Sequence, residues 1–255
     1  LEQKVAVSRF IMTESRASRR LQEALRLPEI RDLLRRHRLV DRVVDDAGRA
    51  LEMARWDTRE GRHVVAMGTG PTVTSAVREL ERSGNRPFQN AEAVAVVLED
   101  LGTRPGLRQR LATAGLPILE ATSVTHIRNS IEHALRLSRA ACVPAVMLVD
   151  REILQSMASI QILPNRVGDG PPAGPPRRRG LRWDEVGGPL RIARRLELNS
   201  VRAMPSPGER SAIGFIVAGP AERSMRRIEV ILGVEGRVPT LHLAVSNPLD
   251  HTAIE

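Results

Sequence analysis

The sequence predicts an α/β protein built on a parallel β-sheet that is flanked by helices. From about residue 62 onward, short apolar runs alternate with amphipathic helical stretches. The run AVAVVLED at 93–100 is apolar at nearly every position, which is typical of a strand covered on both faces. This βαβαβαβ succession predicts parallel strands with helices on both sides. A second, partial α/β segment is expected at 209–255.

The first 60 residues are predicted to form a helical N-terminal region. RRLQEALRL and IRDLLRRHR read as short helices with their charges on a solvated face. A helical apolar stripe follows at Val40, Val43, Val44, Ala47, Leu51 and Ala54.

The main α/β domain is expected over residues 61–160. Its helices are placed at TVTSAVRELERSG, RPGLRQRLATAG and SVTHIRNSIEHALRLSRAA. Pro105 near the start and Gly115 at the end bound the middle helix. Its strands are placed at HVVAM, AVAVVLED, LPILEA and VPAVMLVD.

Residues 161–208 are expected to be a linker, because 164–180 are dense in proline, glycine and arginine. The second segment, 209–255, then reads as strand, helix and strand at AIGFIVAG, PAERSMRRIEVILGV and RVPTLHLAV. NPLDHTAIE reads as the start of another helix. Because the chain begins with Leu1 and ends inside a β-α unit, the sequence is expected to be a fragment of a longer chain.

Composition excludes several classes of function. The net charge is +9, but Lys4 is the only lysine, tyrosine is absent and aromatic residues are 2 % of the chain, so no nucleic-acid partner is expected. A single cysteine, Cys142, excludes a disulfide or an iron–sulfur site within this chain, and it is expected to be a buried apolar residue. No apolar run is long enough for a membrane span, so no membrane and a cytoplasmic location are expected.

The turn after the strand HVVAM invites comparison with a dinucleotide site. Gly68 and Gly70 supply the first two glycines of G-x-G-x-x-G, and Glu99 lies at the end of the next strand. Val73 stands where the third glycine is expected, and Pro71 removes one amide that could donate to a phosphate. A dinucleotide-binding enzyme that uses Gly68, Gly70 and Glu99 therefore remains an alternative, and a plain tight turn is favoured over it on these residues.

Two further patterns are weak evidence for a metal site. Gly168-Asp169-Gly170 resembles a diphosphate-metal motif, with Asn199 downstream, but it runs into PPAGPP rather than into a helix. The six histidines form neither HxH nor HxxxH, so no metal site is predicted.

A family resemblance emerges from the order of the segments between 60 and 255. AVVLED, LPILEA, SVTHIRNSIEHALRLS and VPAVMLVD, in that order, resemble the pyrimidine-binding domain of the 2-oxoacid:ferredoxin oxidoreductases. The closest members are the alpha subunits of indolepyruvate ferredoxin oxidoreductases. IGFIVAGPAERSMRRIEVILGVEGRVPTLHLAVSNPLDHTAIE is similar to the transketolase C-terminal-like domain that follows in that family.

The resemblance implies a thiamine diphosphate-binding fold of the pyrimidine type and oxidative decarboxylation of a 2-oxoacid, such as indolepyruvate. Thiamine diphosphate with Mg would be shared with a diphosphate-binding domain that is not in this chain, and iron–sulfur clusters would lie only in missing regions or partners. The implied partners are other subunits or domains of the oxidoreductase, ferredoxin, the 2-oxoacid and coenzyme A. An oligomer is expected.

The resemblance also implies the site residues. Asp46 takes the place of the acid that activates the aminopyrimidine, a role for which the family uses glutamate. The residues expected to face the cofactor are Met67, Gly68, Thr69, Gly70, Glu99 and Asp100. Gly68 also replaces the family's lysine. These departures favour a second alternative, a non-catalytic paralogue with an assembly or regulatory role.

Overall fold

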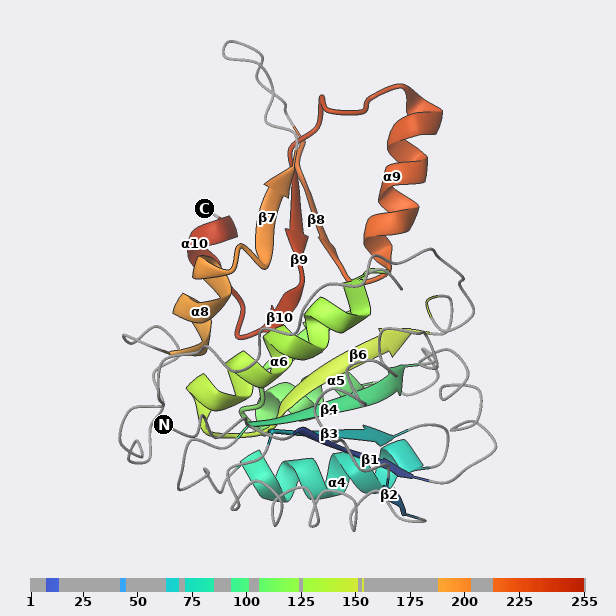
Figure 1. The fold of residues 1–255 in the computed structure, drawn as a ribbon. Helices are drawn as coiled ribbons and strands as arrows, with labels where there is room; N and C mark the ends of the chain where they lie inside the picture. The colour runs from blue at the N-terminus through green and yellow to red at the C-terminus, as the bar shows by residue number, and fades with distance from the viewer. Residues whose placement is uncertain are drawn as a thin grey trace, which may run out of the picture.

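The computed structural model describes residues 8–13, 42–44, 63–68, 72–84, 93–100, 106–123, 126–150, 153, 188–202 and 213–254 (Figure 1). These residues form two sheets, with helices packed on the larger one. Within the described ranges, no helix combines the length and the apolar content that crossing a membrane requires.

The larger sheet has seven strands in the order β10-β5-β6-β4-β3-β1-β2. All neighbours pair in parallel except β10 with β5. The strands are β1 (Ser8–Thr13), β2 (Arg42–Val44), β3 (His63–Gly68), β4 (Ala93–Asp100), β5 (Ile118–Glu120), β6 (Ala145–Asp150) and β10 (Val245–Asn247).

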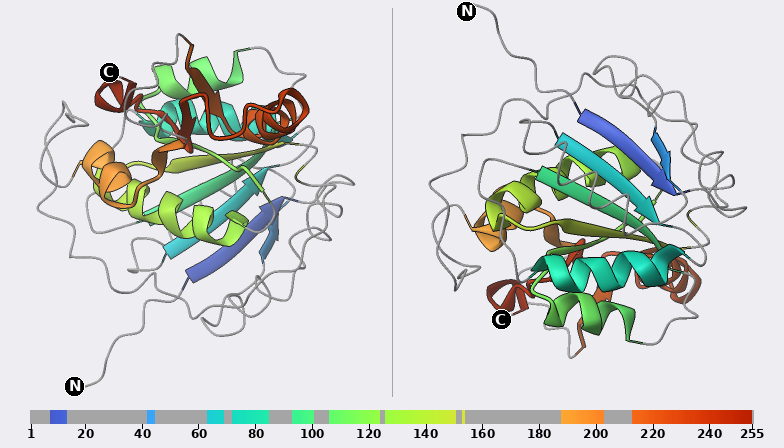
Figure 2. Two further views of the ribbon diagram at one scale, coloured as in Figure 1. Left: turned by 90° about the horizontal axis from the view of Figure 1, so that it is seen from above. Right: turned by 90° about the horizontal axis from the view of Figure 1, so that it is seen from below.

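The central strands are buried on both faces, as the apolar run of β4 predicts. Ala93, Ala95 and Val97 join a core with α6 (Ile127–Ala141) and α8 (Pro189–Arg195). The alternate side chains of β4 point into a second core, beneath α4 (Thr72–Gly84) and α5 (Leu107–Thr113). Figure 2 shows these helix pairs on opposite sides of the strands. The predicted α/β fold class is therefore confirmed.

The smaller sheet has three strands in the order β7-β9-β8. β7 (Asn199–Arg202) is antiparallel to β9 (Thr240–Leu243), and β8 (Phe215–Ala218) is parallel to β9. Helix α9 (Ala221–Leu232) connects β8 to β9, and α10 (His251–Ile254) ends the described chain. The guanidinium of Arg194 on α8 binds Asp250 through two nitrogens, at 2.6 and 2.9 Å, which fixes the start of α10.

The prediction of helices for the N-terminal region is wrong at two places. Residues 8–13 and 42–44 are strands, and β1 lies between β3 and β2 in the larger sheet. The sequence pattern predicts a helical stripe that includes Val43 and Val44, but these two β-branched residues pair with β1 in parallel register instead. The other residues of the predicted 1–60 region lie outside the described residues.

The prediction of a linker over 161–208 is also wrong in its last part, which contains α8 and β7. Pro189 occupies the first turn of α8, where a missing N–H costs nothing. Leu190 and Ala193 are buried, the latter in the core with α6. The Pro- and Gly-rich stretch 164–180 itself lies outside the described residues.

The second segment is joined to the larger sheet. Its last strand, β10, pairs antiparallel with β5, and the side-chain amide of Asn247 donates to the carbonyl of Leu116 at 2.6 Å. Asn199 accepts a hydrogen bond from the Val245 backbone at 2.9 Å, which ties β7 to β10. The predicted division of the chain into domains at 160 and 208 stays a prediction.

Candidate functional site

The order of the strands indicates where a ligand would bind along the edge formed by their carboxyl ends. The chain runs from β1 outward to β2, then returns to the opposite side of β1 with β3 and continues to β4. Successive connections therefore depart in opposite directions from β1 and β3. In open α/β sheets, ligands bind outside the carboxyl ends of the strands at such a switch point. Gly68 ends β3 at that edge.

Some of the predicted site residues lie together at this edge. Gly68 is in register with Leu98, so Glu99 and Asp100 extend β4 just beyond the end of β3. Gly68 and Asp100 are buried, and Glu99 is partly exposed. Asp46, Thr69 and Gly70 lie outside the described residues, and the structure places only the backbone of Met67, on β3.

A cluster of one half-exposed arginine and two buried acids lies next to this position. Arg108, on α5, donates from Nε and Nη2 to the two carboxylate oxygens of Glu120 at 2.8 and 2.9 Å. Its Nη1 donates to Asp100 Oδ2 at 2.6 Å. The Asp100 and Glu120 side chains are only 7 % and 2 % exposed, so one arginine forms ion pairs with two buried acids at the ends of β4 and β5.

The cluster holds Arg108 in its charged form. The hydrogen bond to Glu120 is the main reason that the pKa of Arg108 is raised above its ordinary value, while burial acts in the opposite direction. The guanidinium is therefore a permanent cation. Asp100, one of the predicted cofactor contacts, is bound by this cation.

The second segment reaches the same cluster. Ser246, on β10, donates its hydroxyl to Glu120 Oε1 at 3.0 Å. Gly219, after β8, has a φ of +55°, and a Cβ built there would lie 3.0 Å from the Cβ of Glu120. Glu120 thus connects the larger sheet, α5 and the turn before α9, and the close approach requires glycine at 219.

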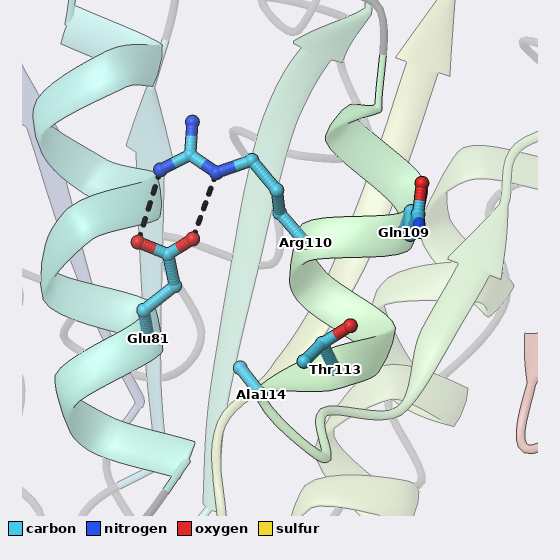
Figure 3. A pocket seen from close by; sticks show the side chains of 5 residues that line it. All are labelled: Glu81, Gln109, Arg110, Thr113 and Ala114. Carbon is cyan, nitrogen blue, oxygen red and sulfur yellow. Dashed lines mark hydrogen bonds and ion pairs between the residues drawn. The ribbon is translucent and has the colours of Figure 1, made fainter.

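The opposite edge of the sheet holds a different feature. Glu81, Gln109, Arg110, Thr113 and Ala114 line a depression of about 370 Å³ between α4 and α5, and Arg110 binds Glu81 through Nε and Nη2 at 2.8 and 2.9 Å (Figure 3). Glu81, Thr113 and Ala114 belong to the last turns of these helices, which return the chain toward the amino ends of the strands. This depression is therefore separate from the switch point.

A further buried pair lies in the smaller sheet. His242 Nε2 on β9 is 2.9 Å from Glu222 Oε2 at the start of α9, and Arg226 donates to Glu222 Oε1 at 2.6 Å. These residues fasten α9 to its sheet. Cys142, predicted to be a buried apolar residue, is indeed buried, and its thiol lies 3.7 Å from the Arg139 carbonyl oxygen.

Sequence reasoning missed Arg108, Glu120 and Ser246. The one available signal was the acidic end of LPILEA, which follows a buried apolar run as Glu99 and Asp100 do. Nothing in the spacing pairs Glu120 with Ser246, because 126 residues separate them.

Comparison with solved structures shows the fold. A 2-oxoglutarate:ferredoxin oxidoreductase from Magnetococcus marinus, solved with 2-oxoglutarate, coenzyme A and succinyl-CoA bound, superposes with a TM-score of 0.58 at 11 % identity. The alignment covers 98 % of this chain and 52 % of the oxidoreductase chain, so this chain spans about half of that length. An inactive β4 tetramer of a split-gene transketolase aligns with a TM-score of 0.49 at 12 % identity, covering 95 % of this chain and 67 % of the transketolase chain. No protein-family model and no curated protein matches the sequence.

Proposed function

We propose that this chain supplies the pyrimidine-binding half of a thiamine diphosphate site in a 2-oxoacid:ferredoxin oxidoreductase. The observation that carries the proposal is the position of Met67 and Gly68, the last two residues of β3, at the carboxyl end of the strand beside the switch point. The fold shared with a 2-oxoglutarate:ferredoxin oxidoreductase over 98 % of this chain supports it. An aryl 2-oxoacid of the indolepyruvate type is the proposed substrate class, on the sequence resemblance.

The described residues fit one side of such a site. Thiamine diphosphate, when bound, supplies the carbanion that attacks the keto carbon of a 2-oxoacid. The chain's part is to hold the pyrimidine ring and to place a carboxyl group beside it. Glu99, which is partly exposed at the carboxyl end of β4, is proposed for a contact with the ring. Asp46 is proposed for the acid that faces the ring nitrogen.

The diphosphate, its Mg and the iron–sulfur clusters are assigned to other domains or subunits of the assembly. Ferredoxin is the proposed electron acceptor, and coenzyme A the proposed acyl acceptor. The chain is proposed to act as one part of an oligomer.

The test uses the assembled complex, purified from its source with this chain in place. The complex should reduce ferredoxin when given a 2-oxoacid, and activity lost on removal of thiamine diphosphate should return when it is added back. We expect Asp46→Ala and Glu99→Gln to lower activity at least about tenfold, since general acid–base groups contribute on the order of 100-fold or more. Glu81→Gln, in the depression between α4 and α5, is the matched control and should leave the activity unchanged.

The same assay separates the alternatives. A complex that assembles but shows no thiamine-dependent turnover would favour the non-catalytic paralogue, to which the missing glutamate and lysine point. Saturable binding of NAD to the isolated chain, lost in Glu99→Gln, would favour the dinucleotide alternative. Full activity in Asp46→Ala would remove that residue from the acid role.

A further inference from the structure

Strand β8 is an outer strand of the smaller sheet, as far as the described residues define it. Its inner edge pairs with β9, and its sequence, FIVA, contains no charge and no proline. Soluble proteins usually protect such edges with charged residues or proline, because an open edge can pair with another strand. Phe215 and Ile216 are both exposed.

Helix α9 presents apolar side chains to solvent beside this strand. Ile228, Ile231 and Leu232 follow the i, i+3, i+4 spacing of one helical face, and Ile231 is 81 % exposed. The inward side of α9 instead carries Met225, together with the polar contacts that Glu222 and Glu229 make to β9. An exposed apolar stripe of this kind marks an interaction surface.

The two features lie at the same end of the smaller sheet. Glu229 accepts a hydrogen bond from Thr240 at 3.2 Å, and Thr240 is the register partner of Phe215. The last turns of α9 therefore lie at the same end of the sheet as the exposed start of β8, as Figure 1 also shows. The β8–α9 surface is defined here as Phe215, Ile216, Ile228, Ile231 and Leu232.

We propose that the β8–α9 surface joins two copies of this chain. Strand β8 would pair antiparallel with β8 of the second copy across a twofold axis normal to the sheet, giving one continuous six-stranded sheet. An antiparallel edge is self-complementary, because each residue pair exchanges N–H and C=O groups in the same way from both sides. Such an isologous contact closes on itself and leaves neither edge open.

The charges of α9 match this arrangement. A twofold axis normal to the sheet leaves both α9 helices on the same face and antiparallel. Arg223 and Arg226 lie in the first half of the helix, Arg227 lies just past its middle, and the exposed Glu235 follows its end. The basic half of one helix would then face the negative end of the other. The uncharged strands at the centre keep the two +9 chains from placing like charges in contact.

The proposal does not depend on the oxidoreductase function and is tested on the whole 255-residue chain. We expect light scattering after gel filtration to give twice the mass of one 28.1 kDa chain. Measurements should run from about 1 to 100 µM, the range in which a standard-size interface of micromolar affinity dissociates. A chain that stays monomeric at the highest concentration would overturn the proposal and leave the surface to a different protein.

Variants then locate the contact. Ile231→Asp and Ile216→Lys place charges on the β8–α9 surface and should each weaken dimerisation at least about tenfold. Ile254→Asp, which also adds a charge at an exposed isoleucine but on α10, should leave the dimer unchanged. Far-ultraviolet circular dichroism confirms that each variant is folded. A dimer that tolerates both surface changes, or is weakened as much by Ile254→Asp, would contradict the assignment.

Discussion

Two arginines on one helix allow a controlled measurement of what burial adds to an ion pair. Arg108 and Arg110 are about equally exposed, at 49 % and 48 %, and each binds a glutamate through Nε and Nη2 with the same pair of distances, 2.8 and 2.9 Å. Their partners differ: Glu120 is 2 % exposed and Glu81 is 35 % exposed. The perturbation is Arg108→Met, with Arg110→Met as its control. Methionine retains the apolar stem of the side chain.

The two substitutions should differ several-fold in their effect on the free energy of unfolding. Arg108→Met removes the guanidinium that binds the buried Glu120 and Asp100 side chains, and removal of one partner from a buried pair costs about 3–5 kcal/mol. We expect the lower end, about 3 kcal/mol, because Arg108 is half exposed and Ser246 still donates to Glu120. Arg110→Met breaks a surface pair and should cost about 0–1 kcal/mol.

Urea unfolding at pH 7, followed by circular dichroism, measures both losses. In thermal unfolding, about 3 kcal/mol corresponds to a decrease in Tm of roughly 6–12 °C for a chain of this size. The double variant Arg108→Met, Glu120→Gln should regain at least about 1 kcal/mol over Arg108→Met, since it removes the uncompensated charge. Equal losses in the Arg108 and Arg110 variants, or no recovery in the double variant, would refute the reasoning.

Three further predictions follow from single contacts. Gly219→Ala should cost about 2 kcal/mol or more, because its Cβ would lie 3.0 Å from that of Glu120, whereas Gly233→Ala, also at positive φ but with nothing within 4 Å, should cost only the backbone strain of about 1 kcal/mol; urea unfolding compares them. Burial is the main reason that the pKa of His133 is lowered from 6.5 to about 4, so the unfolded chain binds a proton that the folded chain does not. Stability should therefore fall by at most about 3 kcal/mol between pH 6.5 and pH 4, and His133→Asn should remove this dependence in unfolding curves recorded across that range. Arg194 on α8 lowers the pKa of Asp250, so Asp250→Asn should lower the free energy of unfolding by about 2 kcal/mol in urea at pH 7. The difference in this free energy between the variant and the wild type should become smaller as the pH falls through the lowered pKa.

The central sheet could be predicted because the burial of each strand is visible in the strand's own sequence. A strand covered by helices on both faces needs apolar side chains at odd and even positions, and AVAVVLED meets that requirement without reference to any other segment. The helices after β3, β4 and β5 are likewise marked by their own periodicity.

Strands β1 and β2 could not be identified in the same way. Phe10-Ile11-Met12 is too short an apolar run to separate a strand from a helix, and Arg42–Val44 is shorter still. Their conformation is decided by pairing, β1 with β3 and β2 with β1. Pairing partners that are distant in sequence leave no local signal.

In the candidate site, too, the sequence identifies the acidic residues but not the distant residues that bind them. A buried acid at the end of a strand must be paired or must bind something, and the sequence alone treats Glu99, Asp100 and Glu120 alike. The structure separates them, because one arginine from α5 binds both Asp100 and Glu120 while Glu99 stays partly exposed. The acids that looked most like ligands by position therefore include one that stabilises the fold. Because the same arginine fixes the Asp100 side chain at the carboxyl end of β4, Arg108→Met should disturb any ligand at this edge even though Arg108 itself need not touch it.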